Sequence, residues 1–182
     1  MAASSDVSIM IDALVSAGAK ALADYDAFDQ DRIDHIVKKA SVAALDRHAA
    51  LAKLAVEETG RGVFEDKAVK NIFACEHVTH SMAKLRTVGV ISEDEISGIT
   101  EIADPVGVIA GITPVTNPTS TAIFKALLAL KTRNPIVFAF HPAAQRCSAE
   151  AVVWCGTPRS RPARRRAASS GSSSRRSRRP RR

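Results

Sequence analysis

The sequence predicts an α/β fold in which N-terminal helices precede an incomplete parallel sheet. Apolar residues recur at helical spacing through the first half of the chain. In the second half, two short and continuous apolar runs, 105–113 and 136–140, flank another helical segment. Such runs are typical of strands that are buried on both faces, and the order strand, helix, strand predicts a right-handed βαβ unit.

Three helical segments are expected ahead of the sheet. Residues 6–24 carry apolar side chains at helical spacing, and a second block runs from 29 to 59, where Gly60 and Gly62 mark its end. The third segment spans 64–85. Its expected apolar face consists of four residues: Val69, Ile72, Phe73 and Val78.

The period then changes from helix to strand. Residues 88–91 and 99–103 are expected to form short strands around an acidic turn, and the strand 105–113 follows. Asn117 and Pro118 suit the N-cap and first position of a helix that carries a solvent-exposed cationic side: Lys125, Lys131 and Arg133. Ligand sites of βαβ units lie beyond the carboxyl ends of the strands, here around 113–117 and 141–144.

Charge divides the chain at about residue 150. The formal net charge is +7, and residues 151–182 hold eleven arginines and no acid, so residues 1–150 carry −4. From Trp154 onward, every residue type used has G or C at its middle codon position, as expected for a GC-rich gene read in a shifted frame. We therefore expect one partial cofactor-binding domain over 1–150 and a disordered, frameshifted tail over 151–182. The alternative is a genuine Arg/Ser-rich tail that binds nucleic acid.

Other features exclude several classes of protein. No apolar run is long enough to span a bilayer, and the N-terminus lacks a basic signal region, so a cytoplasmic location without membrane association is expected. The three cysteines have no metal-ligand spacing. The grouping of Glu76, His77 and His80 has no second cluster to complete a metal site, so we expect a solvated helix face and no metal.

Three blocks of sequence resemble a known family. They are PVGVIAGITPVTNPTST with FKALLALKTRN, the His141-Pro142 pair after the second strand, and EETGRGVFEDKAVKN upstream. Together they closely resemble the aldehyde dehydrogenases, in particular the CoA-acylating acetaldehyde branch found in bifunctional aldehyde-alcohol dehydrogenases. The likeness covers about residues 6–150 and implies that the incomplete sheet is Rossmann-like.

The resemblance implies an oxidoreductase that converts a short aldehyde to its acyl-CoA, with NAD as cofactor and coenzyme A as second substrate. A homo-oligomer is compatible with it. Asn117 is the candidate catalytic residue, as an oxyanion donor. A gapless match to the non-acylating pattern instead puts Thr116 at that position. A separate alternative is that the main role of Asn117 is to cap the helix.

The same resemblance implies a cofactor cleft lined by six residues: Thr113, Pro114, Val115, Thr116, His141 and Pro142. The catalytic cysteine of the family lies in a later domain. Cys75, Cys147 and Cys155 lack the setting that would activate a thiol. We therefore expect this chain to be inactive alone and to bind NAD weakly.

Overall fold

A computed structural model of the chain describes residues 2–156. Its elements follow one another in this order: α1 (Ala2–Asp26), α2 (Gln30–Leu45), α3 (His48–Thr59), α4 (Phe64–Cys75), α5 (His77–Met82), β1 (Gly89–Asp94), β2 (Ile99–Ala103), β3 (Ile109–Thr113), α6 (Pro118–Lys131), β4 (Ile136–Phe140), the 3-10 turn η1 (Pro142–Ala144) and α7 (Gln145–Gly156). The expected α/β class, with helices before an incomplete parallel sheet, is confirmed.

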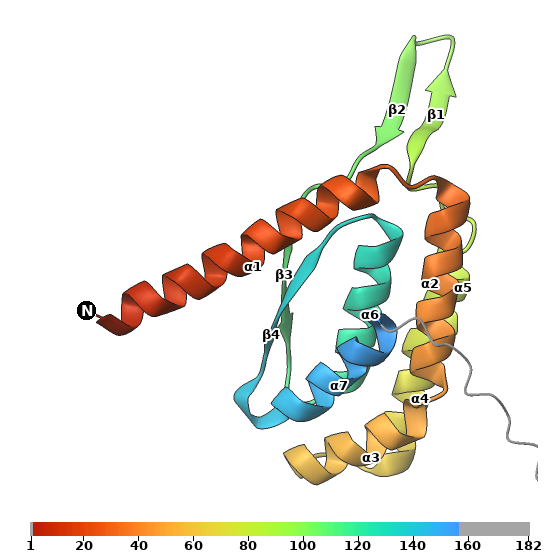
Figure 1. The fold of residues 1–182 in the computed structure, drawn as a ribbon. Coiled ribbons are helices and arrows are strands. Elements are labelled where there is room, and N and C mark those ends of the chain that lie inside the picture. The colour runs from red at the N-terminus through yellow and green to blue at the C-terminus, as the bar shows by residue number, and fades with distance from the viewer. Residues whose placement is uncertain (1, 157–182) are drawn as a thin grey trace, which may run out of the picture.

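The strands β3 and β4 form a two-stranded parallel pair, with Ile109 opposite Ile136 and Thr113 opposite Phe140. The helix α6 connects them, so this part of the chain is the βαβ unit that the apolar runs predict. α6 covers one side of the pair, while the long α1 runs along β4 on the other side (Figure 1). β1 and β2 pair antiparallel in a hairpin that projects from the body of the molecule (Figure 1).

The core lies in the helical layer on the α6 side. There α2, α3, α4 and α7 gather around α6 (Figure 1). Its largest fully buried apolar side chains come from three of these helices: Ile33, Leu51, Ile123 and Leu127. The layer therefore buries its apolar stripes without help from the hairpin.

Two expected helices are each broken once. The block 29–59 divides at Asp46 and Arg47 into α2 and α3, which run in different directions (Figure 1). The block 64–85 divides at Glu76 and ends early, at Met82. Neither break contains glycine or proline, so no local signal announced them; the change of direction lets α3 lie along α4.

The apolar face expected for the segment 64–85 is only half correct, because Val78 packs against the core and Ile72 is half-buried, but its other two residues face solvent. Val69 and Phe73 are exposed, at 64% and 58%, whereas Lys67 and Asn71 are buried. The buried polar groups are satisfied, because the Lys67 ammonium donates to the Thr116 carbonyl at 3.0 Å and the Asn71 amide donates to the His48 carbonyl at 2.9 Å. Hydrogen bonding, rather than apolar period, decides which face of α4 turns inward.

The solvent-exposed cationic side expected for α6 also needs correction. Lys131 is only 2% exposed and forms an ion pair with Asp34 of α2. Arg133 is buried too, and its guanidinium bonds the Asp26 carboxylate at 2.8 Å. A buried cation requires a partner, and each of these has a carboxylate from an N-terminal helix, which spacing along α6 alone does not reveal.

The helix α7 continues six residues beyond the boundary expected at residue 150. Ala151 and Cys155 are buried in the core of the helical layer, so residues 151–156 belong to the fold. The rest of the expected tail, residues 157–182, lies outside the described residues. The frameshift and nucleic-acid interpretations of that tail therefore stay predictions. Within the described part of the chain, no helix is long and apolar enough to cross a membrane.

Candidate active site

The two predicted ligand loops meet at one edge of the sheet. Because β3 and β4 are parallel and end together at Thr113 and Phe140, residues 113–117 and 141–144 both lie at this carboxyl edge. Thr113 is 2% exposed, and its hydroxyl has no hydrogen-bond partner among the described residues. A buried hydroxyl left open at a strand end is a suitable donor or acceptor for a ligand.

The other predicted cofactor residues lie at the surface of the same edge. Exposed positions are Pro114, Thr116, His141 and Pro142. Val115 is half-buried and packs against the small buried cluster of Ala55, Ala144 and Cys147, which lies between the loop after β3, α3 and the start of α7. The structure therefore brings all six predicted positions to the same edge, where four are exposed, Val115 is half-buried and Thr113 is buried.

Asn117 occupies the N-cap position of α6 but does not cap it. Its side chain makes no capping hydrogen bond; instead its Oδ1 accepts from the Lys70 ammonium at 3.1 Å. The expectation that the side chain caps the helix is therefore wrong. Lys70 is a donor only, so the oxygen must face it and the amide N–H₂ must lie on the opposite side of the planar group.

Lys67 also binds the turn that precedes α6. Its Nζ donates to the carbonyl oxygen of Thr116 at 3.0 Å. Burial lowers the pKa of Lys67, and the neighbouring Lys70 charge lowers it further. Beneath it, the Thr119 hydroxyl donates to Asn71 Oδ1 at 2.8 Å, so α4 holds the start of α6 by three polar contacts.

A groove of about 420 Å³ opens beside Asn117. We call it the α4–α6 groove, and its lining comes from α4, the start of α5 and the N-terminal half of α6: Lys70, Phe73, Ala74, Val78, Asn117, Ser120, Thr121 and Phe124. Phe73 and Phe124 form apolar walls, and Asn117 supplies an amide at one end. The arrangement suits a small molecule with an apolar body and one polar oxygen.

The three cysteines are unsuited to act as nucleophiles. All are buried, and burial raises the pKa of each thiol to about 12, with Glu76 adding to the effect at Cys75 and Glu58 at Cys147. A thiol must ionise to attack a carbonyl near neutral pH. Within residues 2–156, therefore, no cysteine has the lowered pKa of a catalytic one.

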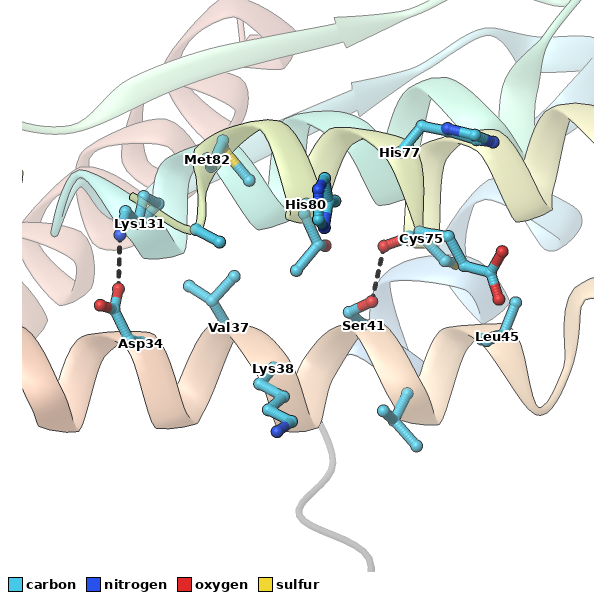
Figure 2. Close-up of a pocket in the computed structure, with 14 residues that line it drawn as sticks. Asp34, Val37, Lys38, Ser41, Leu45, Cys75, His77, His80, Met82 and Lys131 are labelled. Carbon is cyan, nitrogen blue, oxygen red and sulfur yellow. Dashed lines mark hydrogen bonds and ion pairs between the residues drawn. The ribbon is translucent and has the colours of Figure 1, made fainter. Parts of the chain in front are cut away.

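A second hollow, of about 760 Å³, lies between α2 and α5 (Figure 2). Val37, Leu45 and Met82 line it with apolar surface, and the Lys131–Asp34 ion pair closes one end. It contains none of the predicted site residues and lies at the opposite end of α6 from Asn117. His77 and His80 also border it, but the described residues contain no group of three metal-binding side chains.

A parallel βαβ unit with open strand ends, set behind a helical layer, defines an α/β protein of the dinucleotide-fold class. Residues 3–157 match the model of the aldehyde dehydrogenase family, so the chain belongs to that family. It is 66% identical over 157 residues to aldehyde-alcohol dehydrogenase 2 of Entamoeba histolytica, an alignment that covers 81% of this chain and 18% of that protein. The chain thus spans about a fifth of this curated relative.

Solved structures agree. An acetylating aldehyde dehydrogenase from Geobacillus thermoglucosidasius is similar with a TM-score of 0.78 and 46% identity, covering 80% of this chain and 32% of that one. A propionaldehyde dehydrogenase from Rhodopseudomonas palustris with bound propionyl-CoA has a TM-score of 0.65 at 32% identity, covering 79% and 32% of the two chains. An engineered glycolyl-CoA reductase with bound NADP⁺ also has a TM-score of 0.65, at 30% identity, covering 79% and 32%.

Sequence reasoning missed most of the groove. Asn117, Ser120, Thr121 and Phe124 follow one another at i, i+3, i+4 and i+7, which is one face of a helix, so half of the lining was available as a pattern. The other half comes from α4 and the start of α5. There the exposed Phe73 was assigned to the core and Lys70 carried no signal.

Proposed function

We propose that this chain supplies the N-terminal part of a CoA-acylating aldehyde dehydrogenase: half of a nicotinamide cofactor cleft, the oxyanion donor and one side of the aldehyde groove. The observation that carries the proposal is the shared position of Asn117, which belongs both to the carboxyl edge of β3 and to the α4–α6 groove. Cofactor and aldehyde must approach each other, and Asn117 is where the two surfaces meet.

The residues at the carboxyl edge fit a dinucleotide. Two parallel strands end there with an unpartnered Thr113 hydroxyl and exposed side chains at Thr116 and His141. The bound cofactor, NAD in our proposal, would accept a hydride from the substrate. Thr113–Thr116 and His141-Pro142 would bind and orient it, although this edge has no glycine-rich phosphate loop of the GxGxxG type.

The role of Asn117 follows from how its amide is held. Lys70 fixes the carbonyl oxygen of the amide and leaves the N–H₂ group able to donate elsewhere. An N–H donor held in place before the reaction stabilises the negative charge that develops on an aldehyde oxygen. The rival residue, Thr116, is exposed, and its backbone carbonyl rather than its side chain is engaged by Lys67.

The cysteine nucleophile must come from a part of the full-length enzyme other than this sequence, whose three cysteines all lie within the described residues. The three thiols within it are buried and un-ionised at neutral pH. The chain alone should therefore not oxidise aldehydes. The alternative of a nucleic-acid-binding protein is not supported by the relatives described above, whose names are those of dehydrogenases and a reductase.

A chimera tests the proposal directly. Residues 1–157 of this chain replace the matching segment of the Entamoeba histolytica enzyme, and NADH formation is measured with acetaldehyde in the presence and absence of coenzyme A. We expect CoA-dependent activity. Asn117→Ala should lower kcat by roughly a hundredfold or more, whereas Thr116→Ala, at a residue that would only bind the cofactor, should leave kcat nearly unchanged and affect at most the KM for NAD.

Two results would count against this assignment. A chimera that folds but shows no CoA-dependent turnover would refute the proposed function. An active chimera in which Thr116→Ala is the damaging change would keep the function and move the oxyanion donor by one residue.

A further inference from the structure

Glu58 places a negative charge at the carboxyl edge of the sheet, although it belongs to α3. Its two carboxylate oxygens accept hydrogen bonds from the first turn of α7, one from the backbone N–H of Arg146 at 2.8 Å and one from that of Cys147 at 2.6 Å. α7 follows β4 through η1, and α3 lies against η1. Glu58 therefore neutralises the helix N-terminus nearest to His141 and Pro142.

A helix N-terminus at such a place normally attracts anions, because its backbone N–H groups are free and its dipole is positive. In many dinucleotide-binding domains an acidic residue at the end of the second strand bonds the ribose hydroxyls of NAD, whereas a nearby arginine accommodates the 2′-phosphate of NADP. Here the second strand is β4, and the residue after it is His141. The acid is absent from the strand end and is supplied by another element.

We propose that Glu58 is a specificity residue that makes this cofactor edge select a dinucleotide with a free 2′-hydroxyl over one with a 2′-phosphate. The selection has two causes: Glu58 occupies the N–H donors that a phosphate would use, and its charge repels the phosphate dianion. The inference rests on the proposed function, since it concerns which cofactor the same edge takes.

The carboxylate is charged at neutral pH. Burial acts to raise the pKa of Glu58, but the hydrogen bonds from Cys147 and Arg146 and the Arg146 charge outweigh it, so the pKa lies below its ordinary value. Arg146 is the one competing cation on the same turn among the described residues, and no ion pair within 4 Å joins it to Glu58 in that part of the chain. The exposed Arg146 side chain would favour a 2′-phosphate, whereas Glu58 would disfavour it.

The probes are adenosine 5′-monophosphate and adenosine 2′,5′-bisphosphate, which differ only at the 2′-position. Binding to the ¹⁵N-labelled 182-residue chain is followed by NMR through the backbone amides of residues 143–147. This readout is local, so phosphate binding to the arginines between residues 159 and 182 does not count toward it.

We expect the unaltered chain to prefer the monophosphate and Glu58→Gln to reduce that preference by roughly tenfold. Glu57→Gln is the matched control, because Glu57 is the neighbouring acid on α3 and its one ion pair among the described residues is with the exposed Lys53, at 3.8 Å. Glu58→Asp keeps the charge and should keep the preference. Since Glu58→Gln could disturb folding, the unaltered chain is also titrated with salt, and its preference should shrink as ionic strength rises.

The outcomes are distinct. Three results would overturn the role of Glu58 and leave the proposed function standing. They are an equal preference in the unaltered chain and Glu58→Gln, a preference that does not depend on salt, and a preference for the bisphosphate. If neither probe shifts the amides of residues 143–147 even at millimolar concentration, the role of Glu58 is overturned as well, and the turnover of the chimera alone decides whether the proposed function stands.

Discussion

The helical layer and the β1–β2 hairpin of this chain use similar apolar residues with opposite results. In the helical layer, Ile123 and Leu127 are fully buried by neighbouring helices. In the hairpin, every residue of β1 is exposed, Ile102 is 61% exposed and Ile96 has no cover. A helix buries its apolar stripe against other local helices, whereas a two-stranded hairpin has no second layer unless another part of a protein supplies it.

The sheet proper lies between these two extremes. One face of the β3–β4 pair is covered by α6, and Thr113 on that side is buried; Ile112 on the other side is 70% exposed. Parallel sheets are normally covered on both faces. The helical layer therefore supplies most of the apolar burial that stabilises the described part of the chain. The strands add apolar surface that the described residues only partly cover. We therefore predict poor solubility of the isolated chain.

Truncating one large apolar side chain to alanine in each region tests this difference. Leu127→Ala should lower the free energy of unfolding by about 3 kcal/mol, because it leaves a cavity in a closed core. Ile102→Ala in the hairpin should change it by less than about 0.5 kcal/mol. Urea unfolding followed by circular dichroism measures both. Equal losses would mean that the hairpin is buried in solution, for example against a second copy.

Much of this architecture could be predicted from the sequence, for identifiable reasons. The runs 105–113 and 136–140 and the intervening helix gave the parallel unit correctly, because period and length agree there. The six cofactor positions were gathered at one edge by topology alone. What failed was the inward face of α4 and the placement of Lys131. Both depend on partners distant in sequence, Thr116 and Asp34, which no local period reports.

The site was predictable only on its strand side. Asn117 was identified through the family resemblance, at the turn after a buried strand, but its partner Lys70 lies 47 residues earlier on α4. Glu58 gave no signal of its own, because its hydrogen bonds reach α7 across nearly ninety residues. Functional groups that depend on such long-range polar contacts become visible only when the helices are placed.

A second prediction concerns the junction between the two strands of the sheet. A methyl group on Gly111 of β3 would lie 2.7 Å from Cδ1 and 2.9 Å from Cγ1 of Ile136 on β4. Gly111→Ala should therefore cost about 2 kcal/mol through overpacking. Gly156→Ala is the control, because no atom of the described residues lies within 4 Å of its added methyl.

The cause of that loss can be checked by a double mutant. Ile136→Ala removes the clashing atoms, so the pair Gly111→Ala and Ile136→Ala should cost clearly less than the sum of the two single changes. Strict additivity would show that β3 and β4 do not pack as described, and the sheet would then belong with the loosely covered hairpin.

The third prediction concerns the hydrogen bonds that the Glu58 carboxylate of α3 accepts from the first turn of α7, which link the helical layer to the sheet edge. Its folded pKa is lowered, because the hydrogen bonds from Cys147 and Arg146 outweigh the opposing effect of burial. A group with a lowered folded pKa stabilises the fold above its unfolded pKa, and the stabilisation is lost as pH falls through the folded pKa. Glu58→Gln should thus cost about 1 kcal/mol at pH 7, and this cost should fade once the pH falls below about 4. Thermal unfolding of both proteins from neutral to acidic pH measures it, with Glu57→Gln as reference. If the gap instead stays constant with pH, Glu58 acts through packing rather than charge, and its carboxylate then has no part in holding the sheet edge to the helical layer.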